Sequence, residues 1–305
     1  MIKPKNLPES VKQRLKNLAT KSGEDFNALC QYYVMERFLY RVSKSPNSHF
    51  YILKGALMLR VLGGSLSRAT QDIDFQMQNP SDAGSIIETI RECLHEGEAE
   101  DGVRFDPNSL HSTPIQFDAR DRGVRVDLLG YIGTARFKIQ VDVGSGGQII
   151  PKPTWIQYPT LLDFSSPKLL GYPKESIVAD KFEAMVSRDL TNSRIKDFYD
   201  IWILSESESF HEDTLRDALQ STFSYYKTDI PRQKPVCLTE AFLEIPTQEQ
   251  RWNAFLKNAQ IKLDLSLGQV LRRVEVFLMP VCEAIQDESK QNRLWQSSGP
   301  WQSRG

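Results

Sequence analysis

The sequence predicts an α+β fold in which a mixed β-sheet is flanked by helices at both ends of the chain. Apolar residues recur at helical spacing over the first 45 residues, and short segments of alternating polarity follow up to about residue 150. From Glu175 onward the pattern is again mainly helical. At 305 residues, the chain is long enough for one large domain or two.

We predict four segments along the chain. They are an N-terminal helical segment over 1–45, a sheet core over 46–174, a C-terminal helical domain over 175–286 and a disordered tail over 287–305. The tail is predicted from its polar composition, which is rich in Gln, Ser and Gly. Five prolines between 151 and 174 predict an irregular surface connection.

Two helices are predicted before the sheet. Val11, Leu15 and Leu18 share one helical face, and Gly23 would end that helix. The second helix is expected over about 24–43, with Arg37 and Arg41 one and two turns beyond its apolar stripe. The stripe consists of Phe26, Leu29, Cys30 and Tyr33.

The middle of the chain alternates between strand and helix patterns. A turn at Lys54-Gly55 separates the first strand from the first short helix. The expected strands are His49–Leu53, Asp72–Met77, Thr113–Phe117, Gly123–Leu129 and Ala135–Val143, and the expected helices are Ala56–Leu62 and Ser85–Leu94. In the C-terminal region, Thr247 with Gln250 predicts a capping box that starts a helix before Trp252.

Composition excludes several classes of protein. Hydrophobic residues make up 40% and charged residues 25%, which is ordinary for a globular protein. No run of 18 apolar residues occurs, so no membrane span is expected, and the N-terminus does not resemble a secretory signal. Four widely spaced cysteines predict reduced thiols in the cytosol. The net charge of −1 means that a nucleic-acid partner would need a local basic patch.

The sharpest chemical feature is the pair Asp72 and Asp74. In a strand these residues point to the same face, about 7 Å apart, while Ile73 and Phe75 face the core. Two neighbouring carboxylates repel each other unless a cation lies between them, and Mg²⁺ prefers such oxygen ligands. The alternative is an edge strand with two solvated aspartates.

Two further features support a metal and phosphate site. Asp142 lies on the polar face of a later strand and could supply a third carboxylate, although it could equally start a turn. Gly55 lies where a strand meets a helix, a junction that presents backbone N–H groups to anions. Taken alone, this glycine could also be an ordinary turn residue.

A charged pair is predicted on the later helices. Lys181 lies off the face that Val178 and Phe182 would bury, so its loss should slow a reaction without much effect on stability. We expect Lys181 and Asp197 to face one cleft, and we interpret Lys196 and Asp200 as a surface ion pair.

Other catalytic motifs are absent from the sequence. It contains no GxSxG, HExxH, GxGxxG or GxxxxGK[ST] motif, and its four histidines have no metal-ligand spacing.

Six segments follow one another in a characteristic order: Glu36–Ser43, Leu53–Ala56, Arg68–Asp74, Lys138–Gly144, Val178–Lys181 and Arg194–Asp200. With these segments the chain resembles the AbiEii/AbiGii toxin family of nucleotidyltransferases, which includes the MenT toxins. The resemblance covers about residues 10–205.

The resemblance implies a polymerase-β-like nucleotidyltransferase core and a role in toxin–antitoxin or phage-defence systems. It implies that Asp72 and Asp74 bind metal, with Asp142 as the matching residue of the second motif, and that Lys181 and Asp197 are catalytic. It further implies two Mg²⁺ ions, an NTP substrate, transfer to RNA such as the tRNA 3′ acceptor end, a cognate antitoxin and a bacterial cytoplasmic location.

One segment departs from the family pattern. Many members have Gly-Gly-Thr or Gly-Ser after the first strand, whereas this chain has Gly55-Ala56 and lacks the hydroxyl. Backbone contact to a triphosphate remains possible at Gly55 and Ala56, and Ser65, Ser67 and Arg68 could compensate for the lost hydroxyl.

Two other functions stay open on the sequence alone. One is a nucleotidyltransferase that modifies a protein or a small molecule, and the other is a non-catalytic RNA- or partner-binding protein with the same fold. The retained carboxylates and Lys181 disfavour the second. Basic clusters at Arg188/Arg194/Lys196 and Arg272-Arg273 favour a polyanionic partner, unless they are simply solvated helix faces.

Overall fold

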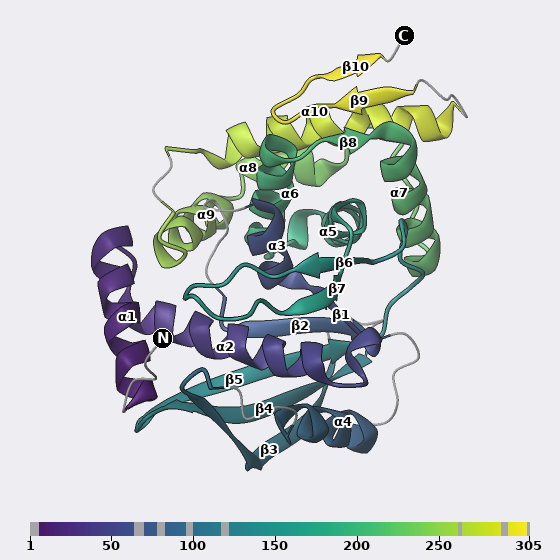
Figure 1. Cartoon of the computed structure of the whole chain (residues 1–305). Coiled ribbons are helices and arrows are strands. Elements are labelled where there is room, and N and C mark those ends of the chain that lie inside the picture. The colour runs from purple at the N-terminus through teal and green to yellow at the C-terminus, as the bar shows by residue number, and fades with distance from the viewer. Residues whose placement is uncertain are drawn as a thin grey trace. The chain divides into compact units, whose positions relative to one another are not determined.

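The computed structural model describes residues 6–63, 70–77, 83–95, 100–116, 122–261, 264–287 and 292–303. It confirms an α+β fold with a mixed sheet and helices at both ends (Figure 1). The chain divides into two compact units. The first unit comprises 1–57, 70–146 and 154–171, and the second comprises 58–69, 147–153 and 172–305. The N-terminal helices therefore belong to the same unit as the sheet.

The first unit is built on a seven-stranded sheet in the order β3-β4-β5-β2-β1-β7-β6. Its pairs are antiparallel except β2 with β5 and β1 with β7, which are parallel. The strands are β1 Tyr51–Lys54, β2 Asp72–Met77, β3 Val103–Gln116, β4 Arg122–Ile132, β5 Ala135–Gly144, β6 Thr154–Gln157 and β7 Lys168–Gly171.

Three strands differ from the sequence-based prediction. β3 starts at Val103, well before the predicted Thr113, and has an irregular register between Asp106 and His111. β6 and β7 lie within the segment that was expected to be irregular. Both strands fit between the prolines, which all lie outside them and therefore remove no N–H group from the sheet. Trp155 on the edge strand β6 is half exposed.

Helices α1 (Leu7–Ser22), α2 (Phe26–Lys44) and α4 (Ala83–His95) form where helices were predicted, and all three belong to the first unit. Gly23 ends α1 with a left-handed φ of 74°, which favours glycine. α2 contacts α1, α4 and several strands of the sheet. It therefore buries 12 of its 19 residues, including the two arginines beyond its apolar stripe.

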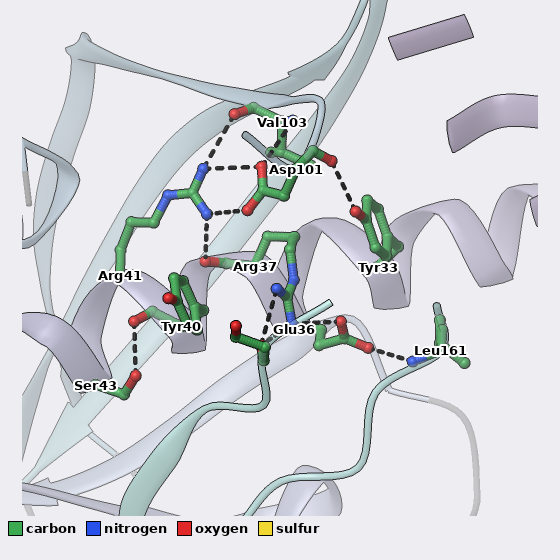
Figure 2. Close-up of polar contacts among 10 residues, drawn as sticks. Tyr33, Glu36, Arg37, Tyr40, Arg41, Ser43, Asp101, Val103 and Leu161 are labelled. Atoms are coloured by element: carbon green, nitrogen blue, oxygen red, sulfur yellow. Dashed lines mark hydrogen bonds and ion pairs between the residues drawn. The ribbon is translucent and has the colours of Figure 1, made fainter. Parts of the chain in front are cut away.

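Buried polar contacts fix α2 to two distant segments (Figure 2). Arg41 forms a bidentate ion pair with Asp101, whose carboxylate also accepts from the Val103 N–H group at the start of β3. Arg37 donates twice to the Ser165 carbonyl, and Glu36 accepts from the Leu161 N–H group. These contacts satisfy buried charges that would otherwise be costly.

The second unit is mainly helical. Helix α3 (Gly55–Gly63) begins in the first unit and continues into the second. The further helices are α5 Lys174–Arg188, α6 Ile195–Ser207, α7 Glu212–Tyr226, α8 Glu240–Leu243, α9 Pro246–Asn258 and α10 Leu267–Gln286. α5 packs against α6 and α7, and α6 packs against α9 and α10.

The predicted capping box is wrong. Helix α9 starts at Pro246, so Thr247 already lies within its first turn and Ile245 is the N-cap residue. Proline suits the first helical position because its missing N–H group would lack a helical partner there. The capping box of this region is formed instead by Ser266 and Gln269 at the start of α10.

The predicted disordered tail is wrong for residues 292–303. Strands β9 (Arg293–Trp295) and β10 (Trp301–Ser303) pair with each other, and β9 pairs with β8 (Phe210–His211). Trp295 is fully buried, and its indole N–H group donates to the Ser205 carbonyl at 2.8 Å. Burial of this large aromatic side chain stabilises an ordered structure here, although the surrounding residues are polar.

In the described part of the chain, no helix is both long and apolar enough to cross a membrane. All four cysteines are buried free thiols, in agreement with the prediction of reduced thiols.

Candidate active site

Strand β2 presents the predicted pair of aspartates on one face. Ile73 and Phe75 are 0% and 1% exposed, whereas Asp72 and Asp74 are partly accessible. The alternation therefore places the apolar side chains in the core of the first unit and both carboxylates on the opposite face. These carboxylates lie in the middle of the sheet, because β2 has β1 on one side and β5 on the other.

Gly55 lies directly against Asp74. It is the first residue of α3 and has a φ of 66°, and a Cβ atom built on it would lie 1.9 Å from Asp74 Oδ2. No real side chain can occupy that space. The carboxylate of Asp74 therefore lies beside the start of a helix, where unsatisfied N–H groups favour negative charge.

Asp142 on β5 is the register neighbour of Asp74 on β2, as the prediction of a third carboxylate requires. Its side chain is buried and forms a bidentate ion pair with Arg125 of β4. Arg125 Nε and Nη2 donate to Asp142 Oδ1 and Oδ2, both at 2.8 Å. The hydrogen bond to Asp142 raises the pKa of Arg125, so this guanidinium stays charged.

Sequence reasoning missed three polar residues of this face. Gln140 Nε2 donates to Asp72 Oδ1 at 2.7 Å, and Lys54 of β1 is the register neighbour of Asp74. Arg125 is the third. Each lies opposite one of the aspartates in the strand register, so a correct strand alignment would have identified them.

The donor set of Asp72 and Asp74 fits a divalent ion. Both are carboxylates on the same face of one strand, which is the ligand type that Mg²⁺ prefers. Among the described residues, however, no group of three His, Cys, Asp or Glu side chains converges on one point. Asp142 directs both oxygens to Arg125. The site with three carboxylate ligands therefore stays a prediction.

The second unit holds a cluster of four charged side chains on α5 and at the start of α6. Lys181 Nζ donates to Asp197 Oδ1 at 2.8 Å and to Asp200 Oδ2 at 2.7 Å. Arg194 Nε donates to Asp197 Oδ2 at 2.6 Å. Asp197 and Asp200 are both fully buried. Lys181 and Asp197 are thus brought together, in direct contact.

Opposing effects act on Asp197. Burial by itself raises its pKa, but the charges of Lys181 and Arg194 outweigh burial and hold the pKa well below its usual range. Asp197 is therefore ionised at neutral pH, as Lys181 requires of a buried partner.

Two sequence-based interpretations of this cluster are wrong. Asp200 is not part of a surface ion pair, because it is buried and accepts from Lys181. Lys181 is not a solvated lysine without a packing role, since its side chain is only 12% exposed and contacts two buried carboxylates. The pattern could not reveal this contact, because it joins two different helices.

The remaining predicted residues concern triphosphate binding. Ala56 is buried as the second residue of α3, so only its backbone could contact a ligand. Ser65, Ser67 and Arg68 lie outside the described residues. The strand-borne aspartates and the Lys181 cluster belong to different compact units.

Comparison with known proteins gives a family. The family model of the nucleotidyl transferase AbiEii toxin, from type IV toxin–antitoxin systems, matches residues 37–277. No curated protein matched the sequence.

Two solved structures from Helicobacter pylori resemble the chain. A candidate nucleotidyltransferase has 13% identity and a TM-score of 0.49, with 87% of this chain and 98% of that chain covered. JHP933 has 12% identity and a TM-score of 0.46, with 86% and 94% covered. Because the family model spans well over half of its length, the chain belongs to the AbiEii nucleotidyltransferase toxin family.

Proposed function

We propose that the protein is a Mg²⁺-dependent nucleotidyltransferase toxin that transfers nucleotides from an NTP to RNA, with the tRNA 3′ acceptor end as the acceptor. One observation carries the proposal. Gly55 has no room for a side chain because the carboxylate of Asp74 lies there, beside Asp142 and at the start of a helix. This arrangement brings anion-binding backbone and cation-binding carboxylates to one place.

The proposed roles follow from these positions. Asp72 and Asp74 would hold the metal, which when bound neutralises phosphate charge and activates the attacking hydroxyl. Gly55 and Ala56 would offer backbone N–H groups to the triphosphate. Gln140 orients Asp72 through its hydrogen bond, and Arg125 fixes Asp142 on the adjacent strand.

Lys181 is proposed as the cation that stabilises charge on the leaving phosphate. Asp197 and Asp200 both accept from its ammonium group, so the charge is held in a fixed place within the second unit. Asp197, which was predicted to be catalytic, is therefore proposed as a positioning residue for Lys181.

The transfer reaction tests this proposal. The purified protein is incubated with each labelled NTP, total RNA and Mg²⁺, and the products are separated on a denaturing gel. We expect label in an RNA band of tRNA size for the wild type and none for Asp74→Asn. The matched control is Asp106→Asn, which keeps the Oδ1 acceptor that Asp106 offers to the Asn108 N–H group and should transfer normally. Label in protein or in a small molecule instead of RNA would contradict the RNA acceptor.

A growth assay tests the proposed toxicity. Expression in a bacterial host should slow growth, co-expression of the cognate antitoxin should relieve the effect, and Asp74→Asn should be harmless. Equal growth inhibition by the wild type and Asp74→Asn would mean that the toxicity does not come from nucleotide transfer.

A further inference from the structure

A pocket of about 520 Å³ lies in the second unit, between the start of α6 and one face of α9. One wall is formed by residues 193–196 and the other by α9. The lining residues are Ser193, Arg194, Ile195, Lys196, Arg251, Ala254, Phe255, Asn258 and Ala259. They include three cations and no carboxylate, although the chain as a whole carries a net charge of −1.

Buried contacts hold the two walls of this pocket together. Gln248 of α9 donates from Nε2 to the Asn192 carbonyl at 3.1 Å, and both residues are fully buried. Asn192 Oδ1 in turn accepts from the Arg194 N–H group at 2.8 Å. The pocket is therefore formed in advance of any ligand and does not depend on surface side chains meeting by chance.

Phe255 gives the pocket an aromatic side. It packs edge-on against Tyr199 of α6, with ring centroids 5.4 Å apart, and lies near Trp252, so its orientation is fixed. Phe255 is partly exposed, whereas Tyr199 and Trp252 are buried. An aromatic ring held in place beside cations is the combination on which a base can stack while its phosphate is neutralised.

We propose that this pocket binds a phosphorylated nucleotide unit, with Arg251 and Lys196 at the phosphate and Phe255 at the base. The bound nucleotide could belong to an RNA strand or be a free NTP, since both present a base and a phosphate. Arg194 links this pocket to the Lys181 cluster, because it lines the pocket and also donates to Asp197. The proposal rests on the proposed function only for its choice of RNA as the strand.

Binding, measured without turnover, tests the proposal. A fluorescein-labelled single-stranded oligoribonucleotide is titrated with the full-length protein at several salt concentrations, and NTP binding is measured in parallel by calorimetry. The variants are Arg251→Ala and Phe255→Leu. The matched control is Lys257→Ala, since Lys257 is an exposed cation of α9 that does not line the pocket.

We expect Phe255→Leu to weaken RNA binding roughly 5- to 100-fold. Arg251→Ala should weaken RNA binding and reduce the slope of log affinity against log salt by about 0.7. Lys257→Ala should resemble the wild type. Losses confined to NTP would identify the free nucleotide as the source, and losses with RNA would identify the strand.

Equal affinities for the wild type, Arg251→Ala and Phe255→Leu would overturn the proposal, as would equal losses in Arg251→Ala and Lys257→Ala. Thermal melting of each variant separates lost binding from lost folding. If no acceptor is labelled but RNA binding still depends on Arg251 and Phe255, the proposed function fails and the pocket assignment stands. If nucleotide transfer occurs but neither RNA nor NTP binding changes in Arg251→Ala and Phe255→Leu, only the pocket assignment fails.

Discussion

On strand β2, Asp72 and Asp74 keep part of their side chains in contact with solvent, whereas Asp197 and Asp200 of α6 are completely buried. The strand carboxylates lie in a row of polar side chains from neighbouring strands. The helix carboxylates instead meet the ammonium group of Lys181, with Arg194 as a further partner. The same residue type thus stands in two different electrostatic environments.

This difference teaches which charges the fold itself requires. The Lys181 cluster contains two carboxylates and two cations, so its charges balance, and removing Lys181 leaves two buried carboxylates without their shared partner. Asp72 and Asp74 are accessible, so losing one charge should harm the reaction and not the fold. We expect substitutions in the two groups to separate activity from stability.

The largest expected effect comes from Lys181→Ala. Removing the ammonium leaves Asp197 and Asp200 buried without it, so the free energy of unfolding should fall by about 3–5 kcal/mol. The rate of transfer should fall at least ~100-fold. Urea denaturation and steady-state kinetics measure the two effects.

The double variant Lys181→Ala/Asp200→Asn provides the control. It removes one of the stranded negative charges, so it should recover part of the stability but none of the activity. Lys257→Ala, which removes an exposed cation of α9, should have a far smaller effect on the rate. If Lys181→Ala has wild-type stability, the buried cluster does not contribute as the structure indicates.

Gly55→Ala should come next. A left-handed backbone costs an L-residue about 1–2 kcal/mol, and the displaced Asp74 carboxylate should add about 1–3 kcal/mol of overpacking. Gly23→Ala isolates the first effect, because Gly23 has a φ of 74° but nothing within 4 Å of an added Cβ atom. Chemical denaturation of both variants gives the difference. Equal losses of stability in Gly55→Ala and Gly23→Ala would show that the Asp74 side chain moves aside at no cost. Normal nucleotide transfer by Gly55→Ala would show that Gly55 is not part of the site.

A smaller effect is expected from metal binding. Saturating Mg²⁺ should stabilise the wild type by about 1–3 kcal/mol, whereas Asp74→Asn should show no shift. In a chelator, Asp74→Asn should melt at the same temperature as the wild type or higher, because one of two repelling charges is gone. Differential scanning calorimetry with and without Mg²⁺ measures this. An equal Mg²⁺ shift in both proteins would place the metal elsewhere.

The smallest effect concerns the pH dependence of stability. The pKa of Asp197 is lowered in the folded state, so its contribution to stability is complete above its unfolded pKa of about 3.9 and is lost as the pH falls toward the lower folded value. The stability difference between the wild type and Asp197→Asn should therefore narrow below about pH 4. Urea denaturation across acidic pH measures it, and a constant difference would contradict the assigned ion pairs.

The sequence predicted the shared face of the strand aspartates because the signal for it is local. Asp72 and Asp74 alternate with Ile73 and Phe75, so the sequence alone indicates which side chains share a face. This period of two holds for a strand in any sheet. That Asp142 lies beside Asp74 depended on strand order, and it was predicted by analogy between two similar segments and the family pattern. Arg125 was missed because its pairing with Asp142 depends on which residues form the turn between β4 and β5, and that turn was not assigned to single residues.

The contacts of the Lys181 cluster could not be predicted in the same way. Lys181 and Asp200 are 19 residues apart and meet only because α5 packs against α6. Composition also misled in the tail, where the average over polar residues concealed the buried side chain of Trp295. The prediction of Thr247 as an N-cap residue was wrong for a different reason, because the helix already begins at Pro246.

The distribution of tryptophan gives the protein a built-in optical reporter. Of its five tryptophans, only Trp155 belongs to the first unit, where it is half exposed. The others, which include the buried Trp252 and Trp295, belong to the second unit. Intrinsic fluorescence should therefore follow the unfolding of the second unit almost alone, while far-UV circular dichroism follows both. A mismatch between the two signals would show that the units unfold separately.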